Sequence, residues 1–136
     1  YLLVTRAPAT RAVPKKALRS ADRIKTMLQF VQTHYAEDLT VEQIAASASI
    51  SPSECLRCFH AVIGTTPMQY VKTFRVQQAA QLLEGTDWPV AKVGRQCGFK
   101  EMGYFARAFR EVYHCTPTEH RRAILQKKAG RAAAKP

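Results

Sequence analysis

The chain has 136 residues, which is enough for one compact unit or for two small units that share a core. It contains no apolar run near the ~20 residues that a membrane-spanning helix requires. The formal net charge is +11, yet residues 21–126 hold 12 basic and 10 acidic side chains, so the excess lies at the two ends and is weak evidence for a nucleic-acid surface.

Residues 1–19 mix Pro, Ala, Thr and basic residues without a sustained period. This composition indicates a basic linker, or the end of an upstream domain that the sequence does not include. The chain begins at Tyr1 without an initiator Met, so we expect a fragment of a longer protein. Residues 128–136 are predicted to form a basic tail, which leaves 20–127 as the folded domain.

Helix-capping signals mark four later helix starts. Thr40 and Gln43 have the spacing of a capping box, in which each side chain bonds the other residue's backbone amide. Ser51, Thr66 and Thr116 are each followed by Pro, which is well tolerated at the first helical position. With the helical apolar period that starts near residue 20, these signals predict helices near 20–36, 41–47, 52–63, 67–84, 89–96, 101–113 and 117–127. Alternating strand patterns are absent, so we predict an all-α fold.

The chain repeats one pattern at a separation of about 50 residues. Phe59 and Phe109 stand 50 positions apart, and each is followed by a turn and a Thr-Pro pair. Two copies are too few for a solenoid. The pattern predicts two helix-turn-helix units, about 41–63 and 89–113, joined by a long helix over 67–84.

The cysteines and histidines do not form a recognisable chemical site. Cys55 and Cys58 have a C-x-x-C spacing that zinc or redox sites use, but they fall inside a predicted helix and no second pair follows. We expect buried thiols in a reduced cytoplasmic protein, with zinc or redox chemistry as the alternative. No P-loop, G-x-S-x-G or H-E-x-x-H motif occurs, so we predict no catalytic residue, no metal site and no cofactor.

Two stretches resemble a known family. "VGRQCGFKEMGYFARAFREVYHCTPTEHR", from Val93 to Arg121, and "LTVEQIAASASISPSECLRCFHAVIGTTPMQYVKTFRVQQAAQLL", from Leu39 to Leu83, are similar to the DNA-binding domain of AraC/XylS-type bacterial transcription regulators. The resemblance covers roughly residues 21–123. Ser49, Gly94, Lys100 and His114 depart from the pattern, which usually has Gly, Ala, a small hydroxyl residue and Gly there.

The resemblance implies seven helices in two helix-turn-helix subdomains, with 52–63 and 101–113 as recognition helices. They would bind double-stranded DNA in successive major grooves and regulate transcription, with activation favoured over repression. The implied setting is the cytoplasm of a bacterium, on nucleoid DNA. The implied partners are DNA, RNA polymerase and an upstream effector or dimerisation domain. The alternative is a helical protein-interaction module whose basic tails bind nucleic acid nonspecifically.

By the same resemblance, the residues that meet base edges are Ser53, Leu56, Arg57, Met102, Gly103, Tyr104 and Arg107. Arg57 and Arg107 are the strongest candidates because a guanidinium can donate two parallel hydrogen bonds to guanine; the alternative is that they only solvate a helix face. The opposite faces, with Cys55, Phe59, Phe105 and Phe109, are predicted to be core. The phosphate-contact candidates are the helix starts at Thr40 and Thr66 and the basic residues Arg75, Lys92, Arg95, Lys100 and Arg110.

Overall fold

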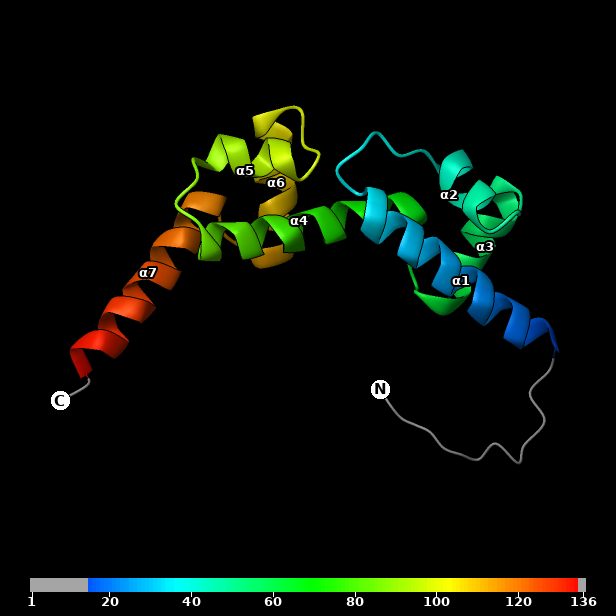
Figure 1. Cartoon of the computed structure of the whole chain (residues 1–136), viewed down its shortest axis with the longest axis horizontal. Helices are drawn as coiled ribbons and strands as arrows, with labels where there is room; N and C mark the ends of the chain where they lie inside the picture. Colours follow the sequence, from blue (N-terminus) through cyan, green and yellow to red (C-terminus); the bar gives the residue numbers. More distant parts are fainter. Residues whose placement is uncertain (1–14, 135–136) are drawn as a thin grey trace.

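The computed structural model describes the backbone of residues 15–134 and the side chains of residues 19–130. This part of the chain forms seven helices and no strand, which confirms the all-α prediction (Figure 1). The helices are α1 (Lys15–His34), α2 (Val41–Ser47), α3 (Pro52–Val62), α4 (Pro67–Gly85), α5 (Val90–Gln96), α6 (Met102–Tyr113) and α7 (Pro117–Ala134).

The predicted capping residues begin their helices in the structure. The Thr40 hydroxyl accepts from the Gln43 amide at 3.1 Å, and the Thr40 amide donates to Gln43 Oε1 at 3.0 Å. Ser51, Thr66 and Thr116 each accept from the amide three residues on, also at 3.1 Å. These bonds satisfy amides that have no partner within the helix, and so they fix where each helix starts.

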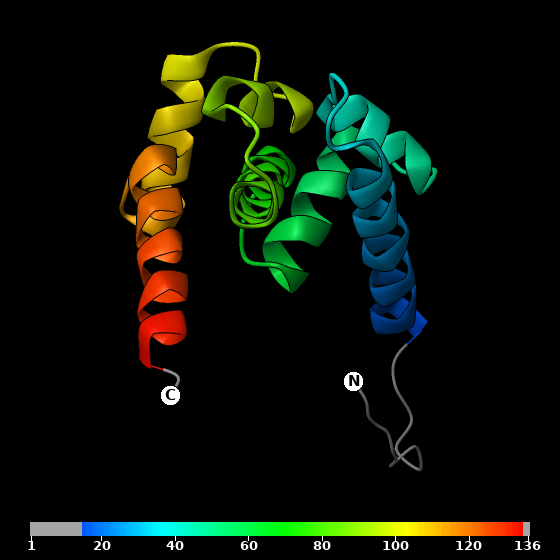
Figure 2. The same cartoon turned by 60° about the vertical axis from the view of Figure 1, so that its left-hand side comes forward.

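The long central helix α4 carries two separate cores, one toward each end. The N-terminal part of α4 contributes Val71 to a core with α1, α2 and α3, in which Phe59 is fully buried. The C-terminal part contributes Val76 and Leu83 to a core with α5 and α6, in which Phe109 is fully buried. Figures 1 and 2 show the pairs α2–α3 and α5–α6 at the two ends of α4 and on the same side of it. The four predicted core residues on the recognition helices (Cys55, Phe59, Phe105 and Phe109) are at most 1% exposed, as expected.

Two helix boundaries differ by five residues or more from the sequence-based prediction. Helix α1 starts at Lys15 rather than near residue 20, and α7 continues to Ala134 rather than ending near residue 127. Both extensions consist mainly of Lys, Ala, Leu and Arg, which are among the best helix formers. The parts of the predicted linker and tail at residues 1–14 and 135–136 lie outside the described residues.

Left-handed residues other than glycine close two of the turns. Ser49 has φ 57° and His114 has φ 62°, so both positions adopt the conformation for which the family pattern uses Gly. Gly64 adopts φ 87° after α3, in the left-handed conformation with which glycine commonly ends a helix. Gly85 likewise ends its helix, α4, but its φ is not positive. There the Thr86 amide and hydroxyl both donate to the Leu82 carbonyl, at 3.0 and 2.6 Å.

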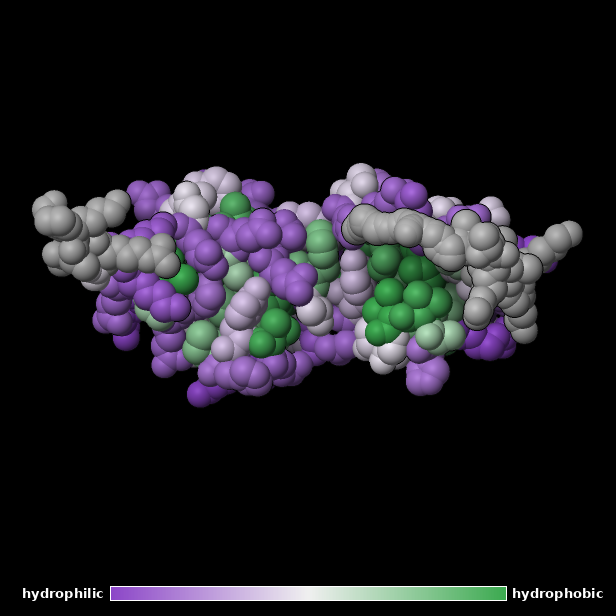
Figure 3. Space-filling view, turned by 90° about the horizontal axis from the view of Figure 1, so that it is seen from below, coloured by the Kyte–Doolittle hydropathy of each residue, from purple (hydrophilic) through white to green (hydrophobic). Residues whose placement is uncertain are grey.

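The face turned away from the helix-turn-helix units is uneven in polarity. Seen from below, hydrophilic residues cover most of the half that contains α5–α7, while an apolar patch lies on the half that contains α1–α3 (Figure 3). Within the described residues, no helix is long and apolar enough to cross a membrane.

Candidate nucleic-acid interface

Helix α3 presents an exposed face with the first group of predicted base-reading residues. Ser53, Leu56 and Arg57 are spaced three and four residues apart, which places them on one side of the helix, and all three are exposed. Leu56 keeps 44% of its surface exposed although it is apolar. The buried residues Cys55 and Phe59 hold the opposite side, so packing fixes which side of α3 faces outward.

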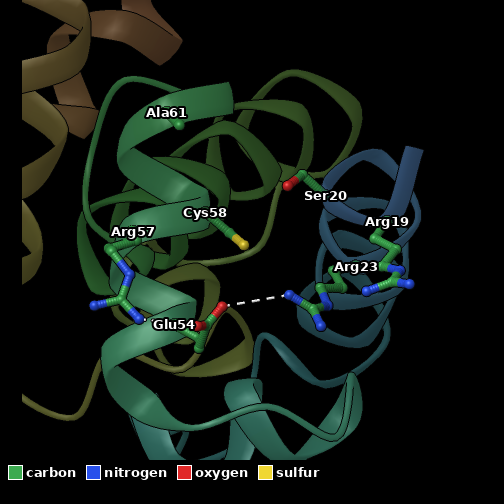
Figure 4. Close-up of a pocket in the computed structure, with 7 residues that line it drawn as sticks. All are labelled: Arg19, Ser20, Arg23, Glu54, Arg57, Cys58 and Ala61. Carbon is green, nitrogen blue, oxygen red and sulfur yellow. Dashed lines mark hydrogen bonds and ion pairs between the residues drawn. The ribbon is translucent and has the colours of Figure 1, made fainter. Parts of the chain in front are cut away.

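Glu54 holds the Arg57 side chain. Arg57 Nη2 donates to Glu54 Oε1 at 2.8 Å, and the Arg57 side chain is still 69% exposed. Arg23 of α1 donates from Nη1 to the other carboxylate oxygen, Glu54 Oε2, at 3.3 Å. Figure 4 shows Glu54 between the two arginines. Arg57, the exposed base-reading candidate on α3, is therefore connected through the Glu54 carboxylate to Arg23 of α1.

Helix α6 presents the second group, with a looser arrangement. Tyr104 and Arg107 are exposed, and the Tyr104 ring lies 5.9 Å from the ring of buried Phe99. Arg107 Nη2 lies 4.0 Å from Glu101 Oε1, which is longer than the corresponding contact of Arg57. Arg107 is thus less tightly held than Arg57.

Met102 and Gly103 differ from the other predicted reading residues. Met102 is half-buried and packs against the second core, so its side chain belongs largely to the packing. Gly103 is exposed, but a Cβ at this position would lie 2.8 Å from Glu101 Oε2. A side chain at 103 would therefore disturb the carboxylate that caps α6.

The basic residues predicted to contact phosphates fall into two groups. Arg95 and Arg110 are exposed, and Lys92 is exposed with its ammonium 4.3 Å from the centre of the Trp88 ring, a cation–π contact. Lys100 and Arg75 instead bind the loop that connects α1 and α2. The side chains of Lys100 and Arg75 thus already have hydrogen-bond partners within the protein.

That loop meets both halves of the molecule. Arg75 Nε donates to the Tyr35 carbonyl at 2.6 Å, and Arg75 Nη2 donates to the Glu37 carbonyl at 2.8 Å. Lys100 Nζ donates to Asp38 Oδ2 at 2.8 Å, and this hydrogen bond lowers the pKa of Asp38. A Cβ on Gly98 would lie 3.0 Å from both Arg75 Nε and the Tyr35 carbonyl oxygen. The two helix-turn-helix units are therefore joined by this junction as well as by α4.

The cysteines are buried as expected, with one exception. Cys55, Cys58 and Cys97 are buried, whereas Cys115 is only half-buried, and all four are free thiols. Burial is the main cause that raises the pKa of Cys55 and of Cys97 to about 11. Among the described residues, no group of three or more His, Cys, Asp or Glu side chains is placed to hold a metal ion.

Comparison with known proteins identifies the family. A family model described as a helix-turn-helix domain matches residues 44–123, more than half of the chain. The fold also resembles a crystal structure from Chromobacterium violaceum described as an AraC-type DNA-binding domain-containing regulator, with a TM-score of 0.74 and 27% identity over 79% of this chain and 96% of that one. The chain belongs to the AraC/XylS-type family of DNA-binding transcription regulators.

Other members of the family support this assignment. The uncharacterized HTH-type transcriptional regulator YdeC of Bacillus subtilis is 35% identical over 74% of this chain and 34% of its own length. The transcriptional activator RhaS of Klebsiella pneumoniae is 28% identical over 85% of this chain and 42% of its own. The DNA-binding domain of AdpA, solved in complex with a target DNA, superposes with a TM-score of 0.71 and 29% identity, covering 82% of this chain and 96% of that one. This chain spans about a third of the length of the first curated relatives it matches.

Two departures from the AraC/XylS pattern have structural reasons. Lys100 does not cap α6; Glu101 does, because its carboxylate accepts from the Tyr104 amide at 2.7 Å. Helix α6 therefore begins at Met102, one residue later than predicted. A Cβ on Gly94 would lie 2.7 Å from Phe105 Cδ2, so glycine lets α5 pack closely on α6.

Sequence reasoning missed the acidic partners of the reading arginines. A signal was available for Glu54, since an acid three residues before an arginine in a helix is a recognised ion-pair spacing. No local signal connects Arg23 with Glu54, because 31 residues separate them. Only the packing of α1 on α3 brings that pair together.

Proposed function

We propose that this AraC/XylS-type domain binds double-stranded DNA sequence-specifically, with α3 and α6 in successive major grooves. The observation that supports this most is the pair of matching exposed helix faces at the two ends of α4. Helix α4 has 19 residues and is therefore about 28 Å long. Major grooves on one side of DNA recur about every 34 Å. A rod of this length is suited to present two helices one turn of DNA apart.

In this proposal the side chains on α3 and α6 read base edges. Arg57 and Arg107 donate paired hydrogen bonds to guanine, Leu56 contacts a thymine methyl group, and Ser53 and Tyr104 contribute further polar contacts. We leave Met102 out of the set because it is half-buried against the second core. Gly103 contributes through the close approach of its backbone. The looser hold on Arg107 leads us to expect less selectivity from α6 than from α3.

Phosphate contacts come from exposed basic residues in the second half. We assign this role to Lys92, Arg95 and Arg110, which are exposed. Lys100 can contribute if its exposed ion pair with Asp38 opens, since both side chains are more than three-quarters exposed. Arg75 is left out, because two of its nitrogens are bonded to the α1–α2 loop. Phosphate contacts at the helix starts marked by Thr40 and Thr66 stay predictions, and the Thr40 amide itself already donates to Gln43 Oε1.

The biological role we propose is transcription activation inside a bacterial cell, with the domain on nucleoid DNA and without catalytic activity. Relatives named as activators support the direction of regulation. Because the chain spans about a third of the first curated relatives, we propose that an upstream effector or dimerisation domain belongs to the full protein. RNA polymerase is the proposed partner at the promoter. The proposed DNA-binding unit runs from α1 through α7.

Selection of bound duplexes from a random DNA pool tests the function directly. The chain should enrich one bipartite motif and should retain it when unrelated duplex DNA is added as competitor. Binding that the competitor removes completely, with no enriched motif, would favour the alternative of a protein-interaction module with nonspecific affinity. A promoter that carries the enriched motif should then give higher reporter expression in the presence of the full-length protein.

A further inference from the structure

A basic pocket lies between α1 and the recognition helix α3. Its lining includes Arg19, Ser20 and Arg23 from α1 and Glu54 and Arg57 from α3 (Figure 4). The sequence alone assigned no function to the α1 residues. Their position beside α3 suggests that the DNA interface includes a second helix on this side.

Glu54 determines how the arginines of the pocket are placed. One carboxylate oxygen accepts from Arg57 at 2.8 Å and the other accepts from Arg23 at 3.3 Å. Two guanidiniums that share one carboxylate are held close to each other although they belong to different helices. If Arg57 points into a major groove, Arg23 therefore lies near the edge of that groove.

The charges of the pocket favour an anion. Three guanidiniums line it together with one carboxylate, Glu54, so positive charge is in excess. Arg19 precedes Arg23 by one helical turn, which places both on the same side of α1. Arg19 is exposed, and the Arg23 side chain is 36% exposed. A guanidinium matches phosphate oxygens with paired hydrogen bonds, and the backbone phosphates border the groove that a recognition helix enters.

We propose that α1 extends the DNA interface: Arg19 and Arg23 contact backbone phosphates beside the groove that α3 enters, and Glu54 positions Arg23 and Arg57 relative to each other. This inference rests on the proposed DNA binding and adds the contact surface on α1. Arg19 and Arg23 act on the backbone, so they contribute affinity without sequence preference. Glu54 acts through Arg57 and is a positioning residue for specificity.

The first test uses Arg19→Gln and Arg23→Gln, with Lys25→Gln as the matched control. Lys25 is exposed, and its replacement by Gln removes the same charge from the same helix. Because Lys25 lies two residues from Arg23, it points to the opposite side of α1. Each arginine variant should lower affinity by a similar factor on the selected and on a scrambled duplex. Each should reduce the slope of log affinity against log salt concentration by about 0.9, the value for one lost phosphate contact. Lys25→Gln should change the slope much less.

Phosphate-ethylation interference locates the contacts. Ethylation of phosphates beside the α3 half of the motif should weaken binding of the wild type and of Lys25→Gln. Arg23→Gln should lose sensitivity at one of these phosphates. Circular dichroism checks that each variant is folded, and Arg23→Lys, which keeps the charge, should retain most of the salt slope. Equal salt slopes and equal ethylation patterns for Arg23→Gln and Lys25→Gln would overturn the proposal.

Glu54→Gln tests the positioning role. The variant frees Arg57 and removes a negative charge near the DNA, so binding to scrambled duplex should strengthen while preference in the α3 half of the motif falls. An unchanged motif would overturn the positioning role, and so would a changed identity of the preferred base, because Glu54 would then read that base itself. Failure of the proposed function is distinguishable: a wild type that enriches no motif contradicts sequence-specific binding, whereas the salt slopes on any duplex still report the α1 contacts.

Discussion

His114 ends α6 in a left-handed conformation, and this single residue carries a measurable cost. Its φ of 62° brings an L side chain into a region that glycine occupies freely, and the side chain is exposed. We expect His114→Gly to raise the free energy of unfolding by about 1 kcal/mol. The matched control is Gly64→Ala, at φ 87°, which should lower it by a similar amount. Urea unfolding measures both, and a destabilised His114→Gly would mean that the imidazole makes contacts that outweigh the strain.

The buried thiols of Cys55 and Cys97 should not react with alkylating reagents in the native protein. Burial raises the pKa of Cys55 and Cys97 to about 11, so at pH 8 both are protonated as well as inaccessible. Iodoacetamide should therefore label half-buried Cys115 first in the native protein, and all four cysteines in urea. Mass spectrometry of the peptides reads this out. Rapid native labelling of Cys55 or Cys97 would contradict the packing of α3 or α5.

At the scale of helices, the close packing of α5 on α6 depends on Gly94. Replacing Gly by Ala inside a helix ordinarily stabilises it by about 1 kcal/mol. At Gly94 the new Cβ would lie 2.7 Å from Phe105 Cδ2, and overpacking of this kind costs about 1–3 kcal/mol. We therefore expect Gly94→Ala to lower the free energy of unfolding. The control is Gly130→Ala in α7, where a Cβ meets nothing within 4 Å and a small gain should follow; equal gains at both positions would contradict the close contact.

The starts of α2, α3, α4 and α7 were predictable from the sequence because capping is local. Ser51 and Thr66 needed only the residues three positions ahead to fix their helices. Helix ends were less predictable, since good helix formers let α7 continue to Ala134 and no single residue sets the limit. The reading faces of α3 and α6 followed from periodicity. The contacts of Arg75 and of Arg23 join residues 31 or more positions apart, so local patterns gave no access to them.

At the scale of the whole molecule, the α1–α2 loop joins the two halves through ionisable contacts. In this loop, the hydrogen bond from Lys100 lowers the pKa of Asp38. At the start of α7, the hydrogen bond from the Thr116 amide similarly lowers the pKa of Glu119. A lowered pKa in the folded state adds stability above the ordinary values of about 3.9 and 4.3, and this stability is lost as pH falls through the folded values. The doubly substituted variant Asp38→Asn, Glu119→Gln should thus show a flatter fall in unfolding free energy below pH 4 than the wild type. Urea titrations between pH 3 and 6 measure the difference, and identical pH profiles would contradict these contacts.

The two cores on α4 fix where the recognition helices α3 and α6 lie relative to each other. The spacing of the DNA site tests this arrangement most directly. Random-pool selection should be repeated with Arg57→Ala and with Arg107→Ala. Each variant should lose preference at one distinct patch, the two patches should lie about 10 base pairs apart, and each loss should cost about 1–3 kcal/mol on the selected site. Affinity for random DNA should fall much less. Loss of preference at the same base pairs in both variants, or an equal loss of affinity on every sequence, would contradict the reading of successive major grooves by α3 and α6.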